Sequence, residues 1–140
     1  MNHIGQFIIN HWAQWLLFII ILLFIFINEL LTQKKRAKEL SPHAAVALIN
    51  DNEQVVLIDL RDKESYRKGH IINSIQAGVE DFDQSKMDKY KSKTVILICP
   101  RGLQSRVVAA KLRSKGFLHP IVLAGGLSAW QNAGLPLIKK

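Results

Sequence analysis

The sequence predicts an α/β domain built on a parallel sheet, preceded by one membrane-spanning helix. Three runs of β-branched and aliphatic residues recur along the chain: VVLIDL (55–60), TVILIC (94–99) and IVLAGG (121–126). Continuous apolar runs of this length are typical of parallel strands that are covered on both faces. Helical segments alternate with these runs, which indicates right-handed crossover connections within one sheet. At 140 residues the chain has room for about one such core beside a membrane segment.

The membrane-spanning helix is predicted from an apolar stretch near the N-terminus. Residues 15–27 read WLLFIIILLFIFI, and the only polar or charged side chains that the wider stretch 12–31 adds, apart from a second Trp, are one Gln, one Asn and one Glu. That is about the length that a tilted bilayer-spanning helix needs. The stretch is apolar on every face, which argues against a helix lying in the membrane interface. We therefore predict an N-terminal transmembrane anchor over residues 1–33 that contacts the lipid bilayer through residues 12–31.

The alternative to an anchor is a cleavable signal peptide. No Lys or Arg precedes the apolar stretch, and the sequence NELLTQKK at its end offers no small-residue cleavage site, so the anchor is favoured. Four basic residues follow the stretch instead: Lys34, Lys35, Arg36 and Lys38. By the positive-inside rule this asymmetry places the N-terminus outside and the rest of the chain in the cytoplasm. Residues 34–40 are interpreted as a basic juxtamembrane linker.

Composition excludes several classes of function. The single cysteine, Cys99, cannot form an intrachain disulfide, a CxxC redox pair or a multi-thiolate metal site. The net charge is +8, but no stripe of Lys and Arg with interleaved aromatic residues indicates a nucleic-acid partner. A lone thiol persists most easily in a reducing compartment, which agrees with a cytoplasmic location.

Two helices are placed by the residues at their ends. Ser41 followed by Pro42 begins the first helix, because serine caps an early N–H group and proline fits the first helical position. The segment AAVALIN supplies its apolar face, and residues 50–52, which read Asn-Asp-Asn, favour a turn that ends the helix. A second helix is expected from near Ser105, in the segment SRVVAAKLRSKGF, with Gly116 as its C-terminal stop.

Cys99 lies at the carboxyl end of the run 94–99, where ligand chemistry gathers in parallel sheets. A short loop, residues 100–102, separates it from the helix expected to start near Ser105. Backbone N–H groups and the dipole at a helix N-terminus stabilise anions, so this position favours a thiolate and can hold a transferred anionic sulfur. The alternative is an inert cysteine, because a lone cysteine that ends a buried strand commonly acts as a small apolar residue.

Three segments resemble signatures of the rhodanese family. CPRGLQS (99–105) resembles the family's active loop, in which a cysteine opens a six-residue loop with glycine at the fourth place. LIDLRDKESYRKGHI (57–71) resembles its first signature, and LAGGLSAWQNAGLPL (123–137) resembles its closing signature. Their order and spacing match over residues 40–138, and three motifs in register are more specific than any one alone. The layout is most similar to that of bacterial single-domain rhodanese-like proteins with a membrane anchor.

The resemblance implies a rhodanese-like domain over residues 41–140, with a parallel five-stranded sheet flanked by helices, in a single-pass protein of the bacterial inner membrane. It also implies a sulfurtransferase. Cys99 would be the nucleophile that accepts a sulfane sulfur as a persulfide and passes it to a thiol or other thiophilic acceptor. No metal or organic cofactor is needed for this double displacement.

The loop after Cys99 is expected to bind the substrate, with backbone N–H groups holding the terminal sulfur and Arg101 attracting an anionic donor such as thiosulfate. The residues of this loop are Pro100, Arg101, Gly102, Leu103, Gln104 and Ser105. Two of them depart from the commoner family pattern. Gln104 stands where Arg or Thr is usual, which weakens anion recruitment, and Pro100 has no N–H to donate. Low activity toward thiosulfate, or a protein-persulfide donor, follows from both departures.

Residues outside the loop are expected to support the fold. Asp59 and Arg61 follow a strand, where they pair with each other or hydrogen-bond the backbone. His70 is expected to be a structural hydrogen bonder, because its spacing reveals no partner carboxylate. The pair Gly125-Gly126 is expected to form a tight turn that approaches the loop, and Trp130 to fill the core.

Two other functions are weighed against sulfur transfer. The loop of a dual-specificity phosphatase ends in an arginine six positions after the cysteine; that position is Ser105, and Arg106 is one place too far to clamp a phosphate. The second alternative is a membrane-tethered interaction module that keeps the rhodanese scaffold and binds a membrane-protein partner, with little or no catalysis. The retained Cys99 favours chemistry, whereas Gln104 leaves room for binding.

Overall fold

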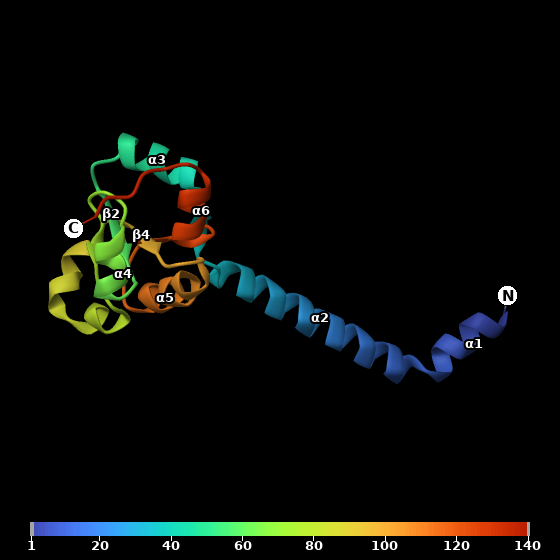
Figure 1. Ribbon diagram of the computed structural model, residues 1–140. Helices are drawn as coiled ribbons and strands as arrows, with labels where there is room; N and C mark the ends of the chain where they lie inside the picture. Colours follow the sequence, from blue (N-terminus) through green and yellow to red (C-terminus); the bar gives the residue numbers. More distant parts are fainter. Residues whose placement is uncertain (1, 140) are drawn as a thin grey trace. The chain divides into compact units, whose positions relative to one another are not determined.

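The computed structural model describes residues 2–139; Met1 and Lys140, at the ends of the segments 1–33 and 41–140 proposed above, lie outside the described residues. The chain forms two compact units, Met1–Arg36 and Ala37–Lys140. Figure 1 shows the first unit as helices and the second as a sheet surrounded by helices.

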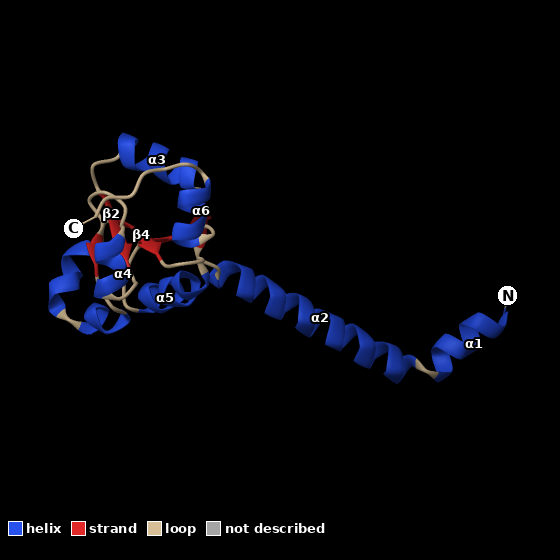
Figure 2. Cartoon of the chain, viewed as in Figure 1, coloured by secondary structure: helices blue, strands red, loops and turns tan. Residues whose placement is uncertain are grey.

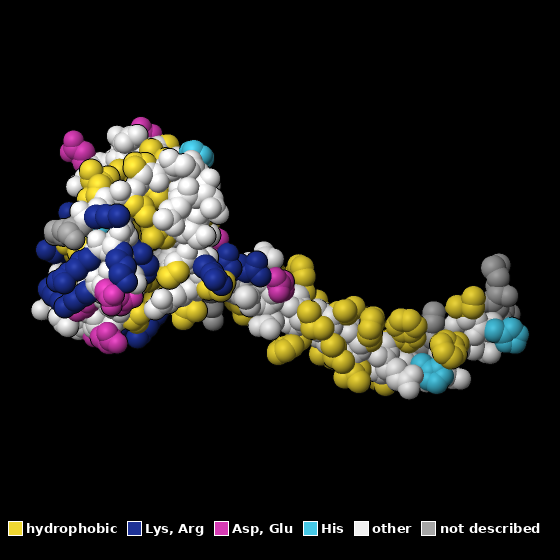
Figure 3. Space-filling model, viewed as in Figure 1, with side chains coloured by type: hydrophobic (Ala, Val, Ile, Leu, Met, Phe, Trp, Pro, Cys, Tyr) yellow, Lys and Arg dark blue, Asp and Glu magenta, His cyan; other side chains and the backbone are white. Residues whose placement is uncertain are grey.

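The N-terminal unit contains helices α1 (Asn2–Asn10) and α2 (Trp12–Lys35). The stretch Trp12–Gln33 of α2 has a mean hydropathy of 2.5 in its most apolar part, none of which is buried by the rest of the protein. No proline or glycine interrupts it, so the backbone N–H groups in its interior all find helical acceptors. Hydrophobic side chains line this helix in Figure 3. The stretch is long and apolar enough to cross a membrane, a property that anchors and N-terminal signal sequences share.

The C-terminal unit is built on a five-stranded, all-parallel sheet, which confirms the fold that the resemblance implies. The strands are β1 (Lys38–Leu40), β2 (Val55–Asp59), β3 (Ile75–Gln76), β4 (Thr94–Ile98) and β5 (His119–Leu123). Their order in space is β1-β5-β4-β2-β3. The three apolar runs of the sequence form β2, β4 and β5, so they occupy the middle of the sheet, with β4 at its centre.

The edge strand β1 differs from the sequence interpretation. Residues 38–40 are assigned above to the basic linker, but they pair in parallel with residues 121–123 of β5. The strand is only three residues long, and both Lys38 and Glu39 are exposed, so no apolar pattern marks it in the sequence. Short, charged edge strands discourage pairing with another chain. Residues 38–40 therefore belong to the sheet.

Helices cover both faces of the sheet (Figure 2). Helices α3 (Pro42–Asp51) and α6 (Gly126–Asn132) lie on one face, and α5 (Leu103–Ser114) lies on the other with the 3-10 helices η1 (Val79–Asp83) and η2 (Ser85–Tyr90). The short helix α4 (Lys63–Lys68) connects β2 to β3. Because side chains alternate along a strand, Val95 and Leu97 of β4 enter one core while Ile96 and Ile98 enter the other.

The N-terminus of α3 and the C-terminus of α5 confirm the end signals read from the sequence. The Ser41 hydroxyl accepts a first-turn N–H at 3.3 Å, and Pro42 is the first helical residue. Gly116, with a φ of +92°, follows α5, and the N–H of Phe117 reaches back to the carbonyl of Leu112. This is the Schellman arrangement, which satisfies the last carbonyls of a helix.

Candidate active site

Cys99 lies in the short link between the central strand β4 and helix α5. Its thiol is free, and the residue is 1% exposed. The backbone N–H of Gly102 donates to Cys99 Sγ at 3.0 Å. Gly102 has a φ of +87°, and a Cβ there would lie 3.1 Å from the backbone N of Gly125, so this turn requires glycine.

Helix α5 begins at Leu103, two residues earlier than the start expected near Ser105. Its N-cap is Gly102, which has no side chain to accept a hydrogen bond, and the usual sequence signal of a helix start is therefore missing. The first-turn N–H groups, on residues 103–105, have no acceptor within the helix. Together with the helix dipole, they create a positive potential beside Cys99.

The loop is held from its other side by the N-terminus of α6. The N–H of Leu127 donates to the carbonyl of Cys99 at 2.8 Å, and the N–H of Ser128 donates to the carbonyl of Pro100 at 3.1 Å. A Cβ on Gly126 would lie 2.2 Å from the carbonyl oxygen of Cys99, so only glycine permits this approach. The predicted approach of this glycine turn to the loop is confirmed. Leu127 and Ser128 were not expected here, because they act through backbone N–H groups that any residue carries.

Asp59 and Arg61 pair with each other at the carboxyl end of β2. Arg61 Nε donates to Oδ1 of Asp59 at 3.0 Å, and its Nη2 donates to Oδ2 at 2.8 Å. The backbone N–H of Arg61 also donates to Oδ1, and Nη2 reaches the carbonyl of Gly69 at 2.7 Å. Because Asp59 is fully buried, its charge depends on this guanidinium for compensation. The pair joins the end of β2 to the segment after α4.

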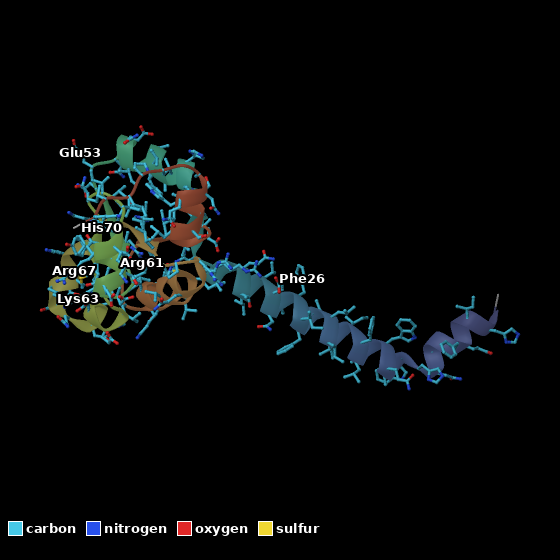
Figure 4. All side chains as sticks on the ribbon, in the orientation of Figure 1. Phe26, Glu53, Arg61, Lys63, Arg67 and His70 are labelled. Carbon is cyan, nitrogen blue, oxygen red and sulfur yellow. The ribbon has the colours of Figure 1, made fainter. Side chains whose placement is uncertain are left out.

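His70 lies beside α4, as Arg61 does (Figure 4). Its Nδ1 lies 2.8 Å from the carbonyl oxygen of Tyr66, and its ring stacks on the Tyr66 ring with centroids 3.8 Å apart. Its backbone pairs with that of Ile138 near the C-terminus. These contacts fasten the C-terminal segment to α4, and none of those described for His70 reaches Cys99.

A pocket of about 350 Å³ opens beside the loop. Arg61 and Arg101 are among its lining residues, together with the polar residues Ser65, Ser128 and Gln131. No carboxylate is among its lining residues, so it suits an anion. Sequence reasoning missed the serines and the glutamine, because α4 and α6 bring them to the loop only through the packing of the sheet.

The remaining loop residues differ in exposure. Arg101 and Gln104 are exposed, whereas Ser105 is fully buried. Arg106 forms an ion pair with Glu39 of β1, with Nε 2.6 Å from Oε1. Because its guanidinium is bound there, Arg106 is not positioned to clamp a phosphate beside Cys99.

Within residues 2–139, no cluster of three or more His, Cys, Asp or Glu side chains could hold a metal ion.

These features define a class of α/β domain in which a cysteine-initiated loop connects the central parallel strand to a helix N-terminus. The family model described as rhodanese-like domain matches residues 41–133. The chain belongs to this family.

The chain is also similar to individual proteins and to a solved structure. The chain is 30% identical to the uncharacterized protein YibN of Escherichia coli over 142 residues, covering 99% of each chain, so the match includes the N-terminal unit. It is 34% identical to thiosulfate sulfurtransferase GlpE of Pseudoalteromonas translucida over 83 residues, which cover 59% of this chain and 79% of GlpE. The solution structure of a rhodanese-like domain from Anabaena superimposes with a TM-score of 0.63 at 28% identity, covering 73% of this chain and 79% of that one.

Proposed function

We propose that this protein is a membrane-anchored sulfurtransferase that holds a sulfane sulfur as a persulfide on Cys99. The observation that supports the proposal most directly is the N–H of Gly102, which donates to Cys99 Sγ at the N-terminus of α5. Backbone donors and a helix dipole at this point stabilise a negatively charged sulfur. A relative named thiosulfate sulfurtransferase supports the same chemistry.

The proposed reaction consists of two displacements. The Cys99 thiolate attacks the sulfane sulfur of the donor, so that an S–S bond forms on Cys99 while the donor's own bond to that sulfur breaks. With thiosulfate as the donor, the electron pair of the broken bond leaves with sulfite. A thiol or other thiophilic acceptor then attacks the outer sulfur, and the Cys99 thiolate leaves. Both steps proceed without a metal or an organic cofactor.

The surrounding residues have distinct proposed roles. Arg101 attracts an anionic donor into the pocket beside the loop, while the N–H groups from Arg101 to Ser105 hold the outer sulfur. Gln104 carries no charge and adds little to this attraction, so we propose a protein persulfide as a donor alongside thiosulfate. Asp59, Arg61 and His70 keep the neighbouring segments in place.

The proposal is tested by loading the full-length protein in detergent with thiosulfate, inorganic polysulfide or cysteine persulfide and measuring its intact mass. The wild type should gain the mass of one sulfur atom, and Cys99→Ser should gain none while keeping its melting temperature. If no donor adds sulfur to the wild type, the proposal is wrong. That outcome favours the membrane-tethered interaction module, for which the exposed Leu103 of the loop and the exposed Val107 of α5 offer an apolar contact.

We also propose that residues 1–33 are a single-pass anchor in a bacterial inner membrane, with the N-terminus outside and the rhodanese domain in the cytoplasm. The apolar stretch of α2 and the basic residues that follow it support this topology. In Escherichia coli the full-length chain should resist extraction with alkaline carbonate, and protease added to spheroplasts should leave the domain intact until the cells are lysed. A shortened chain, or digestion from outside, would contradict the topology.

A further inference from the structure

The buried face of α5 begins with a polar residue that has no partner. Four residues of α5 are buried at helical spacing: Ser105, Val108, Ala109 and Leu112. Ser105 is 0% exposed, and its Oγ has no hydrogen-bond partner among the described residues. A buried hydroxyl without a partner is unfavourable, and alanine at the same position would remove that cost. Ser105 thus places an unsatisfied hydrogen-bond donor at the N-terminal end of this buried face.

Helix geometry favours an orientation of this hydroxyl toward the N-terminal end of α5. Ser105 is the third residue of α5, and side chains on a helix tilt toward its N-terminus. That end of α5 is where the N–H of Gly102 donates to Cys99 Sγ at 3.0 Å. The resting thiol does not accept from Ser105. A second sulfur on Cys99 would extend the group by one S–S bond of about 2.05 Å.

We propose that the Ser105 hydroxyl donates a hydrogen bond to the outer sulfur of the Cys99 persulfide. The proposal rests on the sulfurtransferase function proposed above and adds a side-chain donor to the backbone donors of the loop. The outer sulfur is anionic, and hydrogen bonds to ionised acceptors are stronger than those between neutral groups. No proton is transferred: Ser105 stabilises the loaded state and leaves the resting thiol unaffected. The Ser105 hydroxyl therefore has a hydrogen-bond acceptor only when sulfur is bound to Cys99.

The chain provides a matched control in Ser74. Its side-chain oxygen is also buried and without a hydrogen-bond partner among residues 2–139. Ser74 lies between α4 and β3, where its carbonyl accepts from the hydroxyl of Tyr66. It is not part of the loop or of the pocket beside it. Removing either hydroxyl relieves a similar unpaired polar group, but only the removal at Ser105 should affect bound sulfur.

The test measures the loading equilibrium, in which the Cys99 thiolate and thiosulfate form the persulfide and sulfite. Full-length wild type, Ser105→Ala and Ser74→Ala are equilibrated in detergent with fixed ratios of thiosulfate to sulfite, and the loaded fraction is read by intact mass. We expect the equilibrium constant to fall by roughly tenfold or more in Ser105→Ala, because a hydrogen bond to a charged group is lost from the loaded state alone. Ser74→Ala should match the wild type, and neither variant should melt at a lower temperature.

The outcomes separate this proposal from the function on which it rests. A loading equilibrium in Ser105→Ala equal to that of the wild type overturns the role of Ser105 and leaves the sulfurtransferase intact. An equal shift in Ser74→Ala also overturns it, because the effect would then be general. A wild type that takes no sulfur from thiosulfate, inorganic polysulfide or cysteine persulfide overturns both. The alkylation rate of unloaded Cys99 should be the same in all three proteins.

Discussion

Replacing Gly126 with alanine is expected to destabilise the C-terminal unit by more than about 4 kcal/mol, a loss that only severe structural defects produce. The added Cβ would lie 2.2 Å from the carbonyl oxygen of Cys99, 2.6 Å from the N of Gly102 and 2.7 Å from the N of Arg101. All three are backbone atoms, so they cannot rotate away as the end of a flexible side chain can. Because a typical domain is stable by only about 5–15 kcal/mol, the variant should lose a large part of its stability to unfolding.

Gly134→Ala is the matched control for this prediction. Gly134 also has a positive φ, +74°, but nothing lies within 4 Å of the position of an added Cβ. Alanine there should cost only the strain of the left-handed conformation, about 1–2 kcal/mol. Urea denaturation of both full-length variants in the same detergent gives the two free energies of unfolding. Equal losses would mean that backbone conformation alone requires glycine, and that the contact with the Cys99 loop contributes nothing.

The middle of the fold could be predicted from the sequence because burial leaves a strong pattern there. The strands β2, β4 and β5 are covered on both faces, and each appears as an uninterrupted apolar run. The edge strands β1 and β3 have three and two residues, too few for any periodicity to show. The helix α1 before the apolar stretch was likewise not expected. Local sequence patterns thus identify the strands of the core. They miss the short edge strands, which form by pairing with the core strands.

The residues of the candidate site also form two groups: some are predicted by the local sequence, and others reach the site only through the fold. Cys99 and Gly102 follow from a strand end, a glycine loop and a helix, which are all local in the sequence. The N–H groups of Leu127 and Ser128 reach the loop from more than twenty residues away, and their side chains carry no signal of it. The unpaired hydroxyl of Ser105 could not be foreseen either, because whether a buried serine finds a partner depends on atoms placed by the whole fold.

Arg61→Met should lower the free energy of unfolding by roughly 3–5 kcal/mol, because it leaves the buried carboxylate of Asp59 without a compensating charge. Asp59 is fully buried and the Arg61 side chain is 10% exposed, so little water reaches the pair. The carbonyl of Gly69 also loses its donor. Methionine fills much of the arginine's volume, which separates the electrostatic loss from the creation of a cavity. Denaturant unfolding of the full-length protein measures the difference.

The pair between Lys68 and Glu64 provides the comparison, because its two side chains are 74% and 79% exposed. Lys68→Met should change stability by less than about 1 kcal/mol, as is usual for a surface ion pair. Adding Asp59→Asn to Arg61→Met should recover part of the loss, because the uncompensated charge is then removed while the side-chain oxygen still accepts the backbone N–H of residue 61. If Arg61→Met lowered the free energy of unfolding as little as Lys68→Met, the ion pair between Asp59 and Arg61 could not be what holds the end of β2 to the segment after α4. Another contact would then have to keep Arg61 in its place beside the loop.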